Sequence, residues 1–250
     1  MGTDLLFMLK DFPPKSLYSL DWPDDVKLIG VDPPDSLKCG GVDALCSTAY
    51  TNTYNWLKDS DGRVLPNFLR HYAPGITPGR IAFLGFSAAH GFLDPLATNQ
   101  ADREMISAYL LMDATFGGGK HGYQAFLEDA AAGDRMLVTT TSNTGGDDGW
   151  QTVVKATGIT PEPIDGRDPM PVPSGGVFQL GKLGFWYRFV DAKGGTELPH
   201  WKMAAVREPM IEAYLIPYWQ GKLGGFPWLM AGAAAALAAA GGYAAYRILR

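Results

Sequence analysis

The chain has 250 residues, of which 46% are hydrophobic and 19% are charged, and its formal net charge is −5. This length suffices for one well-buried domain with an appendage, and this composition excludes a largely disordered chain. The acidic balance, without any long run of basic residues, excludes the usual electrostatic footprint of a nucleic-acid-binding protein.

The first segment, residues 3–10, contains the apolar run LLFML and predicts a buried strand that ends at the turn signal DFPP. A second strand is predicted over residues 26–31 (VKLIGV), before DPPD. The N-terminus lacks the basic start of a signal peptide, and Leu6 stands where a myristoylation signal needs Ser or Thr. We therefore expect the folded part to stay on the side of a membrane where it is made.

Cys39 and Cys46 lie seven residues apart in a segment that contains glycine. Two free thiols in a reducing compartment are the favoured interpretation, and a disulfide is the alternative if the chain turns back between them. Two cysteines are too few for a zinc site or a disulfide framework, and no other metal-ligand spacing stands out. Gly117-Gly118-Gly119-Lys120 lacks the first glycine and the final Ser or Thr of a phosphate-binding loop, so we predict neither metal nor cofactor.

The middle of the chain alternates predicted strands and helices. A short helix is expected within VLPNFLRHY (residues 64–72), and RIAFLGFS (residues 80–87) predicts a strand that runs into a sharp turn. A strand is then predicted in 107–116, a helix over 121–134 with Gly133 as its stop, and a strand over 135–142. A loop follows over 144–149, a short helix over 150–158 and a second loop over 160–176. Residues 177–190 predict either two strands or one bent strand, and residues 199–219 a final helix that Pro209 kinks or breaks. This alternation predicts an α/β fold with a mostly parallel sheet flanked by helices, whose functional groups gather beyond the carboxyl ends of the strands.

The most informative turn is the segment from Gly85 to Gly91, with the sequence GFSAAHG. A strand, a serine between small residues and then a helix form the layout of a nucleophile elbow. Small residues are needed two positions before and after Ser87 because larger side chains would collide on a strained turn. The amide of Ala88, at the start of the helix, is then well placed to stabilise an oxyanion.

On these residues the chain resembles the α/β-hydrolase superfamily over most of residues 3–220. PGRIAFLGFSAAHG is similar to the nucleophile strand and elbow, DLLFMLKDFPP to the strand and loop that supply the second oxyanion amide, and ELPHWKMAAVREPMIEAYLIPYW to the histidine loop and last helix. The resemblance implies an α/β-hydrolase-like domain over residues 1–220. The sequence departs from the common pattern at Ala89, where glycine is usual, and it lacks a His-Gly pair in the first loop.

The resemblance also implies a Ser-His-Asp triad in the chain order Ser, acid, His. Ser87 would be the nucleophile and His200 the general base. The acid would come from the loop after RMLVTTTS, which favours Asp148 or Asp147, and Asp113 at the end of the preceding strand is the alternative.

The remaining site predictions concern the oxyanion hole and the other histidines. Ala88 would supply one oxyanion amide, and Phe12 or Asp11 the second. His90 would pack under the site, and His71 and His121 would lie on the surface.

The C-terminal segment from Leu223 to Tyr246 contains no charged residue and predicts one transmembrane helix within residues 221–250. Aromatic residues near both ends and flanking basic residues fit the two membrane interfaces (Trp228, Tyr243, Tyr246; Lys222, Arg247, Arg250). Gly232, Ala236 and Ala240 recur every four residues, which favours helix–helix self-association in lipid. A buried alanine-rich helix of a soluble domain, or a flexible tail, is the alternative. A span at this end places the domain in the cytoplasm, whereas the two arginines beyond it favour the opposite orientation.

The sequence thus predicts a membrane-anchored serine hydrolase that cleaves an ester, thioester or amide of a small-molecule or lipid-like substrate. The first alternative is a non-catalytic protein with this fold that acts as a membrane-bound structural component of a cellular or virion assembly. The second is a soluble cytoplasmic hydrolase whose tail is only a helix.

Overall fold

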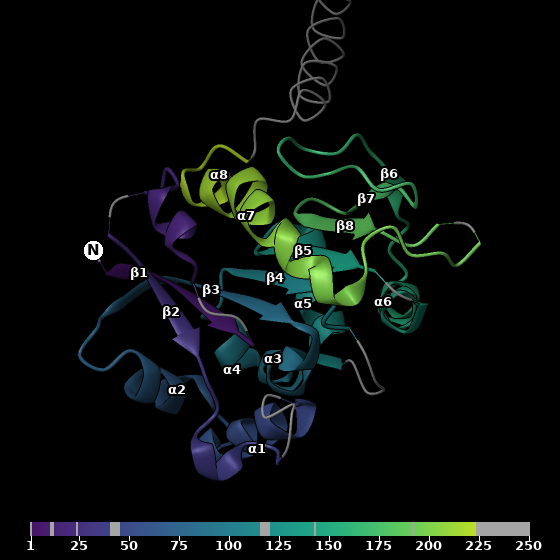
Figure 1. The fold of residues 1–250 in the computed structure, drawn as a ribbon. Helices are drawn as coiled ribbons and strands as arrows, with labels where there is room; N and C mark the ends of the chain where they lie inside the picture. The colour runs from purple at the N-terminus through teal and green to yellow at the C-terminus, as the bar shows by residue number, and fades with distance from the viewer. Residues whose placement is uncertain are drawn as a thin grey trace, which may run out of the picture.

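The computed structural model describes residues 2–10, 13–23, 25–40, 46–115, 121–142, 144–191 and 193–223. They form an eight-stranded sheet in the order β2-β1-β3-β4-β5-β8-β7-β6, with helices on both faces (Figure 1). The strands are β1 (Thr3–Leu9), β2 (Val26–Val31), β3 (Pro78–Phe86), β4 (Ala108–Met112), β5 (Met136–Thr141), β6 (Glu162–Pro163), β7 (Val177–Leu180) and β8 (Gly184–Arg188). The strands from β2 to β8 in this order pair in parallel, and β7 and β6 continue the sheet antiparallel. The predicted α/β class with a mostly parallel sheet is confirmed.

The central strands are apolar on both faces because both faces of the sheet are covered. In β1, Leu5 and Phe7 enter one hydrophobic core and Leu6 and Met8 enter the other. This alternation explains why the run LLFML is continuous in the sequence: every residue of it is buried, on one side or the other.

One helical layer packs against the first of these cores and lies below the sheet in Figure 1. It consists of α1 (Ser47–Leu57), α2 (Leu65–Tyr72), α3 (His90–Thr98), α4 (Gln100–Arg103), α5 (His121–Ala132) and α6 (Thr144–Thr157). The opposite core is covered by helical segments from the two ends of the described chain, namely η1 (Lys15–Ser19), η4 (His200–Val206), α7 (Arg207–Met210), η5 (Ile211–Leu215) and α8 (Ile216–Trp219). A short 3-10 turn, η2 (Asp35–Leu37), follows β2, and another, η3 (Ser87–Ala89), links β3 to α3.

Several local predictions are refined by the structure. The segment TGGDDG is not a loop but the beginning of α6, so the short helix expected from residue 150 starts six residues earlier. Tertiary contacts outweigh the low helix propensity of its three glycines: Asp147 lies in the first turn, where a negative charge favours a helix, and pairs with Arg188 of β8. Residues 177–190 form two antiparallel strands, and the final helical stretch is a succession of 3-10, α and π turns.

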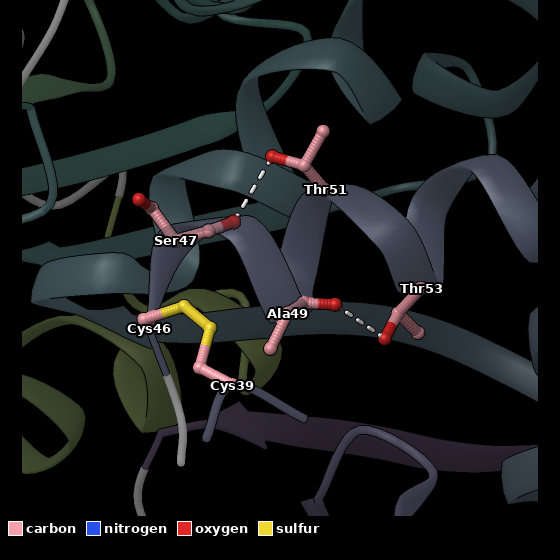
Figure 2. Close-up of a disulfide and its surroundings, with 6 residues drawn as sticks. All are labelled: Cys39, Cys46, Ser47, Ala49, Thr51 and Thr53. Carbon is pink, nitrogen blue, oxygen red and sulfur yellow. Dashed lines mark hydrogen bonds between the residues drawn. A yellow bond between two sulfur atoms is a disulfide. The ribbon is translucent and has the colours of Figure 1, made fainter. Parts of the chain in front are cut away.

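Cys39 and Cys46 are joined by a disulfide, with their Cα atoms 6.2 Å apart (Figure 2). The prediction of two free thiols is therefore wrong, because the fold brings the two cysteines within bonding distance. The bond lies directly before Ser47, the first residue of α1. A Cβ atom on Gly91 would lie 2.4 Å from the carbonyl oxygen of Ser47, so the first turn of α1 rests directly on α3. The disulfide thus secures the start of a helix that packs against the helix following the serine turn.

The segment for which a transmembrane helix is predicted falls almost wholly at residues 224–250, outside the described residues, together with Gly232, Ala236 and Ala240. The loop glycines and lysine at 117–120 and the residues Asp11 and Phe12 also lie outside them. Among the helices of the described ranges, none combines the length and the apolar character needed to cross a membrane.

Candidate active site

Ser87 stands at the carboxyl end of β3, where the strand passes through η3 into α3. Its φ of 50° lies in the left-handed region that residues other than glycine rarely adopt. Such a conformation costs on the order of 1–3 kcal/mol and persists only where the surrounding structure enforces it. The backbone at Ser87 therefore has the strained strand–turn–helix geometry that the sequence predicts for a nucleophile elbow.

The small residues around Ser87 have a steric reason. A Cβ atom on Gly85 would lie 2.3 Å from Cδ1 of Leu93 and 3.0 Å from the Cβ of Ala89, so a side chain at position 85 would require Leu93 to move. Ala89 is fully buried and its methyl group fits in this structure. The departure from glycine at position 89 is thus accommodated, provided that position 85 stays glycine.

His200 reaches the serine from a distant part of the chain. It is the first residue of η4, after Pro199, and its Nε2 lies 2.8 Å from Oγ of Ser87. Its side chain remains 31% exposed, so the imidazole lies at the surface of the site and not within the core. The ring of Phe86, the last residue of β3, stacks on the imidazole with 4.9 Å between centroids and 28° between planes.

Asp113 is the carboxylate behind His200. Its Oδ2 lies 2.6 Å from Nδ1 of His200, and its side chain is completely buried. Asp113 follows β4 directly and, like Ser87, has a positive φ, here 48°. Ser142, at the end of β5, donates its backbone N–H to Oδ1 over 3.1 Å and its hydroxyl to Oδ2. The buried carboxylate is therefore hydrogen-bonded at both oxygens, as burial of a charge requires.

Asp147 and Asp148, the favoured acids of the sequence prediction, lie elsewhere in the structure. Asp147 is buried in α6, where its carboxylate pairs with Arg188 at 2.8 Å and accepts a hydrogen bond from Thr141. Asp148 is exposed on the same helix. The carboxylate brought to His200 is Asp113, so the expected position in the loop after β5 is corrected to the end of the neighbouring strand.

The other predicted residues fall as follows. Ala88, the candidate for one oxyanion amide, is buried in η3 next to Ser87, and Phe12, the candidate for the second, lies outside the described residues. His90 begins α3, with its Nδ1 3.0 Å from the carbonyl oxygen of Ser87. His71 and His121 are exposed, as predicted.

Two residues of the site were not identified from the sequence, namely Phe86 and Ser142. Each occupies the end of a predicted strand, which is where functional groups of a parallel sheet collect. Neither residue type is specific enough to signal a role on its own, because an aromatic residue in a strand or a serine before a loop is usually structural.

The arrangement is a chain of hydroxyl, imidazole and carboxylate groups linked by hydrogen bonds. Its imidazole can take a proton from the hydroxyl while the carboxylate holds the opposite ring nitrogen. Over the described ranges, no group of three or more His, Cys, Asp or Glu side chains is arranged to hold a metal ion.

Comparison of the sequence with protein-family models and with curated proteins finds no match.

Proposed function

We propose that this protein is a membrane-anchored serine hydrolase that cleaves an ester, thioester or amide bond. The observation that carries the proposal is the linked pair of contacts from Ser87 Oγ to His200 Nε2, 2.8 Å, and from His200 Nδ1 to Asp113 Oδ2, 2.6 Å. The positive φ of Ser87 supports the same assignment, because strain of this kind accumulates at functional positions.

In the proposed reaction, Ser87 Oγ attacks the carbonyl carbon of the substrate while His200 Nε2 takes the hydroxyl proton. Asp113 holds His200 in the tautomer whose Nε2 is free to accept and stabilises the imidazolium that forms. The amide of Ala88 donates to the developing oxyanion. The imidazolium then returns its proton to the leaving group, and a water molecule activated by the same imidazole releases the acyl group from Ser87.

The contact between Ser87 and His200 supports this proposal over a non-catalytic scaffold, which would be favoured if the two side chains lay beyond hydrogen-bond reach. The superfamily assignment is part of the proposal, and it is supported by the order of strands, elbow and late histidine along the chain. The membrane anchor is supported by the uncharged segment from Leu223 to Tyr246 and its flanking basic residues.

The direct test of catalysis is labelling of the full-length protein with a fluorophosphonate, which reacts covalently with an activated serine. We expect wild type to be labelled, Ser87→Ala to be unlabelled and His200→Gln to be labelled at least about a hundredfold more slowly. The exposed Ser19 supplies a matched control, since Ser19→Ala should label like wild type. Equal labelling of wild type and Ser87→Ala, or no labelling of a folded wild type, would refute the proposal.

The anchor has a separate test. Full-length protein should sediment with membranes and resist alkaline extraction, whereas a chain ending at residue 222 should be released. Recovery of the full-length protein in the aqueous phase after lysis without detergent would instead support a soluble hydrolase.

A further inference from the structure

Phe86 adjoins both the nucleophile and the histidine of the proposed triad. It directly precedes Ser87 in the chain, and its ring stacks on the imidazole of His200 with 4.9 Å between the centroids and 28° between the planes. The ring is itself partly buried and packs against the hydrophobic core beneath η4, α7 and η5. Phe86 is therefore fixed by the core and presents an aromatic face to the imidazole.

The hydrogen bonds at the two ring nitrogens of His200 and the ring of Phe86 act on different motions of the imidazole. Ser87 and Asp113 hold the two ring nitrogens, at 2.8 Å from Nε2 and 2.6 Å from Nδ1. Hydrogen bonds at two ring nitrogens oppose tilting of a ring about the line joining those nitrogens less than they oppose its displacement. An aromatic ring stacked on one face opposes this tilt directly.

The stacking of Phe86 on His200 also has an electrostatic consequence. The face of an aromatic ring carries partial negative charge and attracts a cation within about 6 Å of its centroid. When His200 takes the proton of Ser87 it becomes such a cation, whereas the resting imidazole is neutral. The stacked ring thus interacts more strongly with the state formed during the reaction than with the resting state, which is the condition for accelerating a step.

We propose that Phe86 is a positioning residue for His200, holding the imidazole flat between Ser87 and Asp113 and favouring its protonated form. This proposal rests on the proposed function where it concerns catalysis. The interaction between the two rings can be tested separately from any activity.

The other groups around His200 bear on how a pH effect is interpreted. Within the part of the chain that the structure describes, the titratable and charged groups on the elements that pack most extensively against η4 are Asp113 after β4 and the Arg207–Glu208 pair in α7, and Lys202 lies within η4 itself. Variants at position 86 leave all of these groups in place. A difference in titration between such variants is therefore attributable to the aromatic face.

The first measurement is an NMR titration of the His200 imidazole in wild type, Phe86→Tyr and Phe86→Leu, with the resonance assigned by its absence in His200→Gln. Leu keeps an apolar side chain but has no aromatic face, so we expect the midpoint in Phe86→Leu to fall by about 0.5 pH unit. Phe86→Tyr should titrate like wild type. An unchanged midpoint in Phe86→Leu, or a shift in Phe86→Tyr as large as that in Phe86→Leu, would overturn the proposal.

The second measurement is the rate of fluorophosphonate labelling across the same pH range. In Phe86→Leu we expect the acidic limb of this pH–rate profile to move to lower pH by the same amount as the NMR midpoint. The rate on the plateau of the profile should fall about tenfold. Phe185→Leu is the matched control, since Phe185 lies in the same core and its ring packs against Tyr214. Phe185→Leu should lower the melting temperature without shifting the acidic limb of the labelling rate. If it shifted that limb as much as Phe86→Leu does, the shift would be due to general loosening of the core.

The two measurements separate failure of this inference from failure of the proposed function. If wild type is not labelled but the NMR midpoints differ as expected, the hydrolase proposal fails and the ring interaction stands. If wild type is labelled and the midpoints coincide, the hydrolase stands and the role of Phe86 is refuted.

Discussion

Replacement of Asp113 by asparagine tests which carboxylate serves the proposed triad. In the structure Oδ1 of Asp113 accepts the backbone N–H of Ser142, while Oδ2 accepts the Ser142 hydroxyl and faces His200 Nδ1. An asparagine would keep its oxygen on the side of the Ser142 N–H, because the opposite orientation would bring two donors together. Its NH2 group would then point at Nδ1 of His200.

An amide donor at this place reverses the tautomer of the imidazole. Nδ1 would become the acceptor and Nε2 would carry the proton, so that His200 could not take the proton of Ser87. In serine hydrolases the corresponding change lowers kcat by about four orders of magnitude, which corresponds to about 5 kcal/mol in the activation barrier. We expect a loss of this size for Asp113→Asn.

The assay is hydrolysis of p-nitrophenyl butyrate, combined with circular dichroism to establish that each variant is folded. Asp148→Asn is the matched control because this carboxylate is exposed on α6, and its kcat should stay within about a factor of two of wild type. Asp147→Asn should lower the melting temperature, because it leaves Arg188 without its ion pair, but should retain kcat. A folded Asp113→Asn variant with nearly full activity, or a large loss in Asp148→Asn, would refute the assignment of the acid.

Three further predictions concern stability. The double variant Cys39→Ala/Cys46→Ala should lose about 2.5 kcal/mol in the free energy of unfolding, as expected for a loop closed over seven residues, and a reductant should destabilise wild type but not this variant. Gly122→Ala should cost at least about 2 kcal/mol in urea unfolding, because its Cβ would lie 1.7 Å from the carbonyl oxygen of Asp94, and an unchanged midpoint would contradict this packing. Burial raises the pKa of Tyr72 to about 12, so as the pH rises the unfolded chain loses this phenolic proton before the folded protein does. The free energy of unfolding should therefore fall between about pH 10 and pH 12. Tyr72→Phe should show a smaller fall when urea unfolding is measured at these two pH values.

Strands such as β1 and β4 could be predicted from the sequence because they are buried on both faces and appear as uninterrupted apolar runs. The beginning of α6 could not, since Gly145 and Gly146 signal a loop while the contact that stabilises this turn, Asp147 with Arg188, joins residues 41 positions apart. The disulfide was only the alternative prediction, for a related reason. Spacing alone cannot tell whether the chain turns back between Cys39 and Cys46.

The acid of the site shows why chain order alone cannot select one carboxylate. Neighbouring strands of a sheet lie about 4.8 Å apart, so the ends of β4 and β5 lie close enough for both to contribute to the surroundings of a histidine above them. In this protein both do, although in different roles: the end of β4 supplies the carboxylate of Asp113, and the end of β5 supplies Ser142, which donates to it twice. Asp147 satisfies the same order along the chain, but its charge is already neutralised by Arg188. The carboxylate that faces His200 is therefore decided by where the fold places each acid, and that depends on residues far from the motif.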